Sequence, residues 1–307
     1  AFSVDTYSIG DTNNQNVTLT GLTDEAVSFV ATSTGTDTLT LAADTVADSG
    51  TFNIGASAAG VTVTAISAAN YETLTINSSG GANTITTLTA NDITSLTVTG
   101  STALTITNAI ASATGLATID ASTMTKAVSI NASNSTGAVT FTGGSGGDTI
   151  TSGAGNDTLT GGSGNDTLTA GNGTNTITGG AGDNTLTGGT GIDTITSGDG
   201  ADTIDSGAGN DTINSGGGND TLTFDTDADL NANDTVDAGA GTDAAAITIG
   251  TALTSPFTLT NVENVDLTIT GAITVDMSGV ASIERLDIEN GTSAGVAVSN
   301  LATGVTV

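Results

Sequence analysis

A nine-residue pattern repeats without interruption from Gly143 to Thr223, and it constrains the fold of this chain more than any other feature. The first copy reads GGSGGDTIT and the third reads GGSGNDTLT. The second and fourth positions are Gly in all nine copies, the seventh is Thr and the eighth is Ile or Leu. The sixth position is Asp in seven copies and Asn in two. Low-complexity sequence, which the 43 glycines alone would suggest, does not hold its columns aligned in this way.

Each copy divides into a glycine-rich part and a short alternating part. The first six residues are expected to turn sharply, because Gly permits positive φ and close backbone approach. The last three, such as Thr149-Ile150-Thr151, alternate polar, apolar and polar, which predicts a minimal strand with one inward side chain. Two such strands would close one turn of a flattened coil. Stacked Ile and Leu would then form its interior, and loops two repeats apart would be neighbours.

The pattern Gly-Gly-x-Gly-x-Asp-x-(large apolar)-x resembles the RTX nonapeptide, a calcium-binding β-helix repeat. The resemblance implies an all-β, right-handed parallel β-roll or β-helix solenoid with calcium ions between consecutive loops on the same side. The ligand positions that it implies on one side are Asp148, Asp166, Asn184, Asp202 and Asp220, and those on the other side are Asp157, Asn175, Asp193 and Asp211. After an insertion of five residues at 224–228 the repeats decay, and Asp234 and Asp243 continue the metal-binding column.

Calcium is expected to act as part of the fold. Stacked carboxylates repel one another without a metal, and the interior receives one large apolar side chain per nine residues. We therefore expect the roll to be loose or unfolded without calcium, so that binding energy becomes folding energy. Weaker sites are expected beside Asn175 and Asn184, where a negative charge is lost. In the alternative interpretation the Asp side chains only cap turns.

The flanks differ from the centre, and we divide the chain into three regions. Residues 1–142 are a Thr-rich β-helix or a β-sandwich, 143–246 are the calcium roll, and 247–307 continue as an irregular β-helix. Alternating runs recur at roughly 20-residue intervals, which predicts longer coils. Similar places are expected for Leu74, Leu96 and Ile119, and also for Leu267 and Leu286.

Two shorter segments of these regions leave alternatives open. Residues 278–286 are the one stretch that would allow a short helix. The alternating oxygen side chains of 225–233 begin like an EF-hand loop, but Leu230 and Val236 stand where that motif needs Gly and a bidentate Glu. This segment is therefore either a further calcium site or a solvated acidic loop.

The charge and the missing residue types limit the chemistry. There are 32 acidic residues against two basic ones, so neither nucleic acid nor membrane insertion is expected. The absence of His and Cys removes zinc sites of those ligands and the Ser-His-Asp and Cys-His nucleophile systems. Oxygen ligands remain, and these suit hard cations such as calcium. We therefore predict that the chain is not an enzyme.

The resemblance also bears on location and function. Segments 261–267 and 283–288 resemble stretches of RTX-bearing bacterial surface-layer proteins. We predict an extracellular protein at the bacterial surface, exported by type I secretion as the RTX resemblance implies. Its predicted partners are calcium ions, copies of itself in a surface layer or filament, and cell-surface polysaccharide. The alternatives are a segment of a secreted RTX adhesin that binds carbohydrate or surfaces, and the RTX part of an enzyme or toxin.

Overall fold

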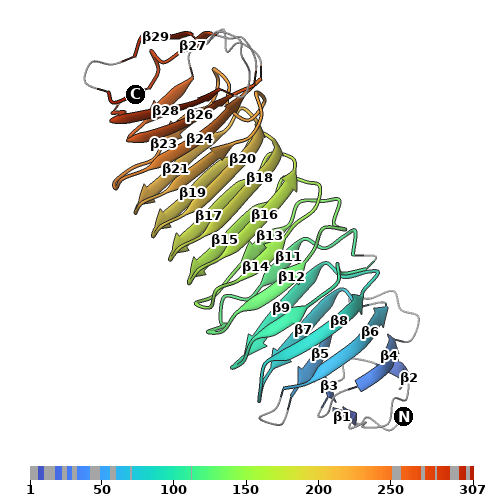
Figure 1. Ribbon diagram of the computed structural model, residues 1–307. Coiled ribbons are helices and arrows are strands. Elements are labelled where there is room, and N and C mark those ends of the chain that lie inside the picture. The colour runs from blue at the N-terminus through green and yellow to red at the C-terminus, as the bar shows by residue number, and fades with distance from the viewer. Residues whose placement is uncertain are drawn as a thin grey trace. The chain divides into compact units, whose positions relative to one another are not determined.

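The structure is a computed structural model with two compact units, Ala1–Ser163 and Gly164–Val307. It describes residues 6–9, 18–22, 26–29, 33–41, 49–55, 60–69, 71–111, 113–250, 257–270, 274–280, 282–290, 297–301 and 305–307. These residues form strands and turns and contain no helix. In the described residues all strand pairs are parallel, and successive strands from β1 to β26 alternate between two sheets (Figure 1).

In Ala1–Ser163 the odd-numbered strands form one sheet and the even-numbered strands form the other. The odd strands are β1 (Thr6–Ile9), β3 (Ala26–Phe29), β5 (Ser49–Ile54), β7 (Thr73–Ser78), β9 (Ser95–Gly100), β11 (Thr118–Asp120), β13 (Thr140–Thr142) and β15 (Thr158–Ser163). The even strands are β2 (Thr18–Leu22), β4 (Ser33–Leu41), β6 (Thr62–Ala69), β8 (Asn83–Thr89), β10 (Leu104–Ile106), β12 (Val128–Asn131) and β14 (Thr149–Thr151).

Large apolar side chains fill the interior of this first unit. Leu74 is aligned with Leu96, and Leu96 with Ile119, so the three predicted equivalents lie on successive coils. Phe52 and Tyr71 are fully buried, with ring centroids 6.2 Å apart in an edge-to-face arrangement. The parallel pairing excludes the β-sandwich alternative for the described part of 1–142, since such sandwiches are built from antiparallel sheets.

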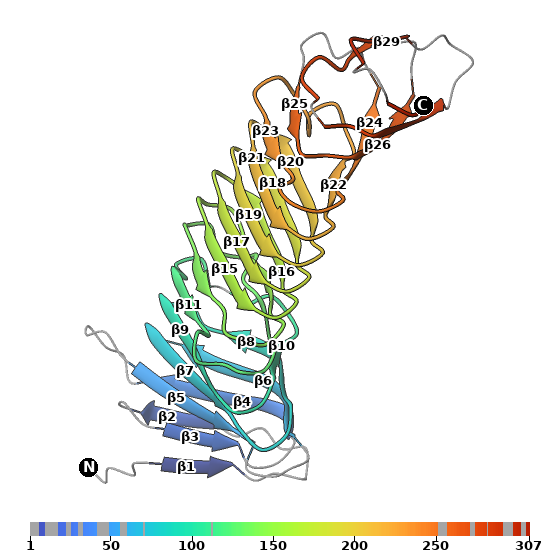
Figure 2. The same ribbon diagram turned by 90° about the vertical axis from the view of Figure 1, so that its left-hand side faces the viewer.

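Gly164–Val307 repeats the arrangement with shorter coils, and Figure 2 shows its odd and even strands on opposite sides. The odd strands are β17 (Thr176–Ala181), β19 (Thr194–Asp199), β21 (Thr212–Gly217), β23 (Thr235–Asp237) and β25 (Thr258–Thr260). The even strands are β16 (Thr167–Asn172), β18 (Thr185–Gly191), β20 (Thr203–Gly209), β22 (Thr221–Phe224), β24 (Ala244–Ile249), β26 (Asn264–Ile269) and β28 (Arg285–Asn290). A separate pair consists of β27 (Thr274–Asp276) and β29 (Ala297–Ser299).

The repeat strands are longer than the sequence predicts. Strand β16 continues past the Thr-Leu-Thr triplet, and Gly171 pairs with Gly189 of the next coil on that side. The glycine-rich part is therefore only partly a turn, because its first three residues extend the parallel ladder. Along the same face Leu168, Leu186, Ile204 and Leu222 are stacked, as expected for repeats that form half a coil each.

The carboxyl-terminal coils differ from prediction in two details. Leu286 is aligned with Val265, and Leu267 with Ile288, so the proposed equivalence of Leu267 and Leu286 is wrong by one inward position. The cause is a coil of 21 residues, two longer than the 19-residue spacing between Leu267 and Leu286. The short helix considered for 278–286 is also wrong for the described residues of that stretch, because Arg285 already begins strand β28.

Candidate functional site

Two rows of acidic and amide side chains run inside the coils of Gly164–Val307, one beside each set of turns. We call the first the Asp202 ladder; its members are Asp166, Asn184, Asp202, Asp220 and Asp243. We call the second the Asp211 ladder; its members are Asn175, Asp193, Asp211 and Asp234. The two rows match the two sides of the predicted roll.

Each ladder is built by one repeated hydrogen bond. The backbone N–H of one member donates to the side-chain Oδ1 of the member one coil further along the chain. In the Asp202 ladder these bonds are 3.0 Å from Asp166 to Asn184, 2.7 Å from Asn184 to Asp202, 2.9 Å from Asp202 to Asp220 and 2.7 Å from Asp220 to Asp243. In the Asp211 ladder they are 2.9 Å from Asn175 to Asp193, 2.9 Å from Asp193 to Asp211 and 2.6 Å from Asp211 to Asp234.

The five-residue insertion leaves both ladders continuous. Within the repeats the bonded members are 18 residues apart, and across the insertion they are 23 residues apart. Asp234 and Asp243 therefore lie in the same two rows as the sixth-position residues of the repeats, and their role as metal ligands stays a prediction.

Asp148 and Asp157 occupy equivalent positions in Ala1–Ser163. Asp148 Oδ1 accepts the N–H of Val128 at 2.8 Å, and Asp157 Oδ1 accepts the N–H of Val139 at 2.7 Å. Both Asp side chains are buried, with 1% exposure each. The donors, Val128 and Val139, are apolar residues of the coils that precede the repeats. Asp148 and Asp157 are therefore the first acidic residues in these positions.

In five Asp residues of the ladders, only one of the two carboxylate oxygens accepts a hydrogen bond of normal geometry. The Oδ2 atoms of Asp193, Asp202, Asp211, Asp220 and Asp243 are buried and accept no hydrogen bond of normal geometry. The Ser197, Ser206 and Ser215 hydroxyls lie near the carboxylates of Asp202, Asp211 and Asp220 and lower their pKa, but by less than burial raises it. Burying an ionised carboxylate without a partner is costly, and a cation removes this cost. These orphaned oxygens are the observation in this structure that fits a bound metal ion.

The electrostatics of the ladders point in the same direction. Burial raises the pKa of the carboxyl groups of Asp148, Asp193, Asp202, Asp220, Asp234 and Asp243 above 3.8. For Asp211 burial raises the pKa to about 6, and the neighbouring charges of Asp193 and Asp234 also raise it. The folded chain therefore disfavours ionised ladders unless positive charge lies between them.

The invariant glycines allow the coils to stack this closely. A Cβ on Gly218 would overlap the carbonyl oxygen of Gly200 one coil earlier, and the φ of Gly218 is 147°. A Cβ on Gly216 would meet Gly198 in the same way. Gly217, which lies between them, has 3.4 Å of clearance to its nearest neighbour, the Asp199 carboxylate. The second and fourth columns are thus fixed by backbone contact, and the third is not.

The amide side chain of Asn184 forms hydrogen bonds through both its oxygen and its nitrogen without a cation. Asn184 Nδ2 donates to the carbonyl of Gly182 at 2.9 Å, while its Oδ1 keeps the ladder bond. A carboxylate has no proton with which to make that first bond. The Asn184 position therefore has the same geometry as the Asp positions, but its side chain needs no metal ion to balance a negative charge.

The ladders would hold ions by pairs of acids. In the part of the chain that the structure describes, no three acidic side chains converge on one point. Successive members of a ladder would each offer carboxylate oxygens, and turn carbonyls would complete the oxygen shell that calcium prefers. The donor set contains only oxygen, which suits Ca²⁺ and not a thiophilic metal.

Three features of this region lacked a recognisable signal in the sequence. Ser197, Ser206 and Ser215 are buried inside the roll at the first position of their repeats. The hydroxyls of Ser197 and Ser215 donate to the carbonyls of Ser215 and Ala238, at 2.6 and 2.9 Å. The third feature is Glu263, whose Oε2 accepts the N–H of Asp243 at 2.8 Å and extends the Asp202 ladder by one more coil.

The loop that resembles an EF-hand start uses its oxygen side chains both within the turn and toward neighbouring coils. Asp229 accepts both the backbone N–H and the hydroxyl of Thr226, each at 2.8 Å. Asp227 accepts the N–H of Gly250 at 2.7 Å, and Asn231 donates to the carbonyl of Gly209. These side chains therefore hydrogen-bond within the turn and to the coils on either side.

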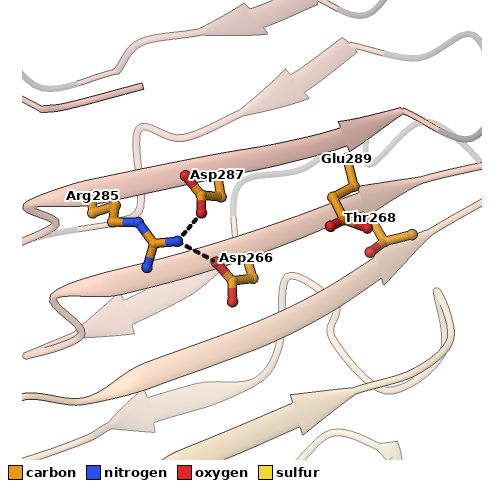
Figure 3. A pocket seen from close by; sticks show the side chains of 5 residues that line it. All are labelled: Asp266, Thr268, Arg285, Asp287 and Glu289. Carbon is orange, nitrogen blue, oxygen red and sulfur yellow. Dashed lines mark ion pairs between the residues drawn. The ribbon is translucent and has the colours of Figure 1, made fainter.

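A shallow polar pocket of about 430 Å³ lies on the outer face of β26 and β28 (Figure 3). It is lined by Asp266, Thr268, Arg285, Asp287 and Glu289. Arg285 forms ion pairs with Asp287 and, at 3.7 Å, with Asp266. Both pairs are well exposed, so they contribute little to stability.

Within the described residues there is no helix long and apolar enough to cross a membrane. No curated protein and no solved structure matches the chain. The sequence profile of the RTX calcium-binding nonapeptide repeat matches in overlapping segments, at residues 135–159, 142–177, 160–195, 178–213, 187–222 and 196–230. Proteins with these repeats bind calcium and are typically secreted. Residues 135–230 of this chain thus match the RTX calcium-binding nonapeptide repeat, with nine copies from Gly143 to Thr223, and they fold as part of a parallel β-solenoid.

Proposed function

We propose that this chain is an extracellular, non-catalytic structural protein that folds on calcium and assembles with copies of itself into a surface layer or filament. The observation that carries the proposal is the series of buried Oδ2 atoms in the two ladders. Each of these atoms requires a cation before the coil is stable at neutral pH, so the protein is built to become rigid where calcium is abundant.

Self-association follows from charge and from sheet edges. A formal net charge of -30 keeps copies apart in the absence of cations. Calcium bound in the ladders reduces this repulsion. In the described part of the chain β1 and β2 are end strands of their sheets, and such strands offer N–H and C=O groups to another chain.

The test is electron microscopy of the purified chain with and without calcium, together with hydrogen exchange under the same conditions. We expect ordered sheets or filaments only with calcium. We also expect chelation to release amide protection in 164–223 while 71–111, which has a large apolar interior, stays protected. Monomeric particles at all calcium concentrations would contradict assembly, and unchanged exchange in 164–223 would contradict calcium-dependent folding.

The pocket on β26 and β28 favours a second candidate, an adhesin segment that binds carbohydrate. Carboxylates, a guanidinium and a hydroxyl surround it, and these groups form hydrogen bonds with sugar hydroxyls. A glycan array probed with calcium-loaded protein separates the two candidates. Binding that is lost in Arg285→Ala would support adhesion, while lattice formation without glycan binding would support the structural role.

A further inference from the structure

Glu263 ends the Asp202 ladder outside the nonapeptide repeats. It lies 20 residues after Asp243, directly before strand β26, in a coil that carries no Gly-Gly-x-Gly-x-Asp sequence. Its carboxylate nevertheless takes the position that an Asp or Asn side chain takes in the preceding coils of the ladder. The side chain of Glu is one methylene longer than that of Asp, so its carboxylate can reach the N–H of Asp243 from a coil of different length.

The acid that Glu263 contacts is fully buried and incompletely bonded. Asp243 has 0% exposure, and its Oδ2 accepts no hydrogen bond. Its Oδ1 already receives the N–H of Asp220 at 2.7 Å. The negative charge of Glu263 acts on this carboxylate at close range and raises its pKa, in addition to the effect of burial.

The backbone holds the two acids in fixed positions. The carbonyl of Asp243 accepts the N–H groups of Glu263 and Asn264, at 3.2 and 2.9 Å. The carbonyl of Glu263 in turn accepts the N–H groups of Glu284 and Arg285, at 2.8 and 3.0 Å. Two carboxylates are thus fixed on adjacent coils, one buried and one half-buried and open to solvent.

From this geometry we propose that Asp243 and Glu263 hold a Ca²⁺ ion that closes the Asp202 ladder beyond the last nonapeptide repeat. The inference rests on the proposed calcium-dependent fold and adds a site and a ligand to it. The ion ties β24 to β26, so the coils after the repeats share the calcium requirement of the roll. A Glu that merely capped the N–H of Asp243 would need no ion, and this difference makes the site testable.

The experiment uses the full chain and the variant Glu263→Gln. The amide oxygen of Gln can still accept the N–H of Asp243, so a capping role survives this change while the metal-binding charge is lost. Glu289→Gln is the matched control, because it makes the same charge change at an exposed acid on β28. Native mass spectrometry counts the bound ions at saturating calcium, and hydrogen exchange reports on 244–249 and 264–269.

We expect Glu263→Gln to bind one calcium ion fewer than wild type and to exchange faster in those two strands, with 164–223 unchanged. Glu289→Gln should match wild type in both measurements. An unchanged ion count in Glu263→Gln would overturn the inference, and so would an equal loss in Glu289→Gln. A wild-type chain that binds no calcium would overturn the proposed function itself, which is a separate result.

A second measurement avoids any effect of the substitution on folding. Crystals of the wild-type chain grown with Tb³⁺ in place of calcium give an anomalous signal at each occupied site. A peak within coordination distance of both Asp243 and Glu263 supports the inference. Peaks between the repeat loops without one at this position overturn it.

Discussion

Replacing Asp211 by Asn should have opposite effects on the metal-free and the calcium-bound protein. Asp211 is 1% exposed, and its pKa is raised from 3.8 to about 6 in the folded chain. An acid with a raised pKa binds its proton more tightly in the fold than in the unfolded chain. Stability of the metal-free fold is therefore lost as pH rises through this interval, and the loss is about 3 kcal/mol once pH exceeds 6.

The amide should remove this penalty because it carries no charge. Asn184 occupies the same repeat position in the other ladder, and it shows that an amide can keep the ladder bond and add a hydrogen bond to the Gly182 carbonyl. We expect Asp211→Asn to stabilise the metal-free fold by about 3 kcal/mol at pH 8 and by less than about 1 kcal/mol at pH 4. In calcium the sign reverses, because two neighbouring sites lose a charged ligand and the calcium midpoint of folding rises.

The assay is circular dichroism in calcium-free buffer, with urea or trimethylamine N-oxide to shift the folding equilibrium at pH 4 and pH 8. Asp199→Asn is the control, because it makes the same charge change at an exposed position of the neighbouring repeat. A metal-free Asp211→Asn variant no more stable than wild type at pH 8 would refute the reasoning. An equal gain in Asp199→Asn would also refute it, since the effect would then be one of net charge.

Two further predictions concern stacking and the interior. Gly218→Ala should destabilise the calcium-bound fold by about 2–4 kcal/mol, because its φ would be strained and its Cβ would overlap the preceding coil. Gly217→Ala should change the stability by less than about 1 kcal/mol. Chemical denaturation compares the two variants, and equal effects would contradict the stacking geometry. Leu186→Ala should destabilise the fold by about 2–5 kcal/mol because Leu186 is fully buried. Ile192→Ala should change the stability little, because Ile192 is 53% exposed. Thermal unfolding in calcium compares the two variants, and a larger loss of stability in Ile192→Ala would contradict the inward assignment of Leu186.

Much of the fold followed from the nonapeptide. The eighth position predicted the buried stack that contains Leu168 and Leu186, and the sixth predicted which acids meet two repeats apart. The insertion predicted the longer step to Asp234. These features are readable because each coil repeats the same backbone path, so a fixed spacing in the sequence becomes a fixed position in space.

The rest depended on contacts between coils of unequal length. The alignment of Leu286 with Val265 arises from a coil of 21 residues, which an approximate period does not resolve. The burial of Ser197 and Ser215 could not be predicted, because the first position of the repeat also carries Gly and Ala and shows no fixed residue type. Strand lengths were underestimated because glycine pairs such as Gly171 and Gly189 stay in the parallel ladder.

The sequence by itself determined the period, the parallel coil and the acidic column, since all three are properties of one repeated unit. The tertiary structure alone decided that one oxygen of Asp193, Asp202, Asp211, Asp220 and Asp243 accepts a backbone N–H while the other accepts no hydrogen bond of normal geometry. It also brought Glu263 to the end of the column. The physical reason is that hydrogen bonds between coils join residues about 20 positions apart. Where the coils differ in length, only the folded backbone shows which side chain reaches the N–H of the preceding coil, as Glu263 reaches that of Asp243.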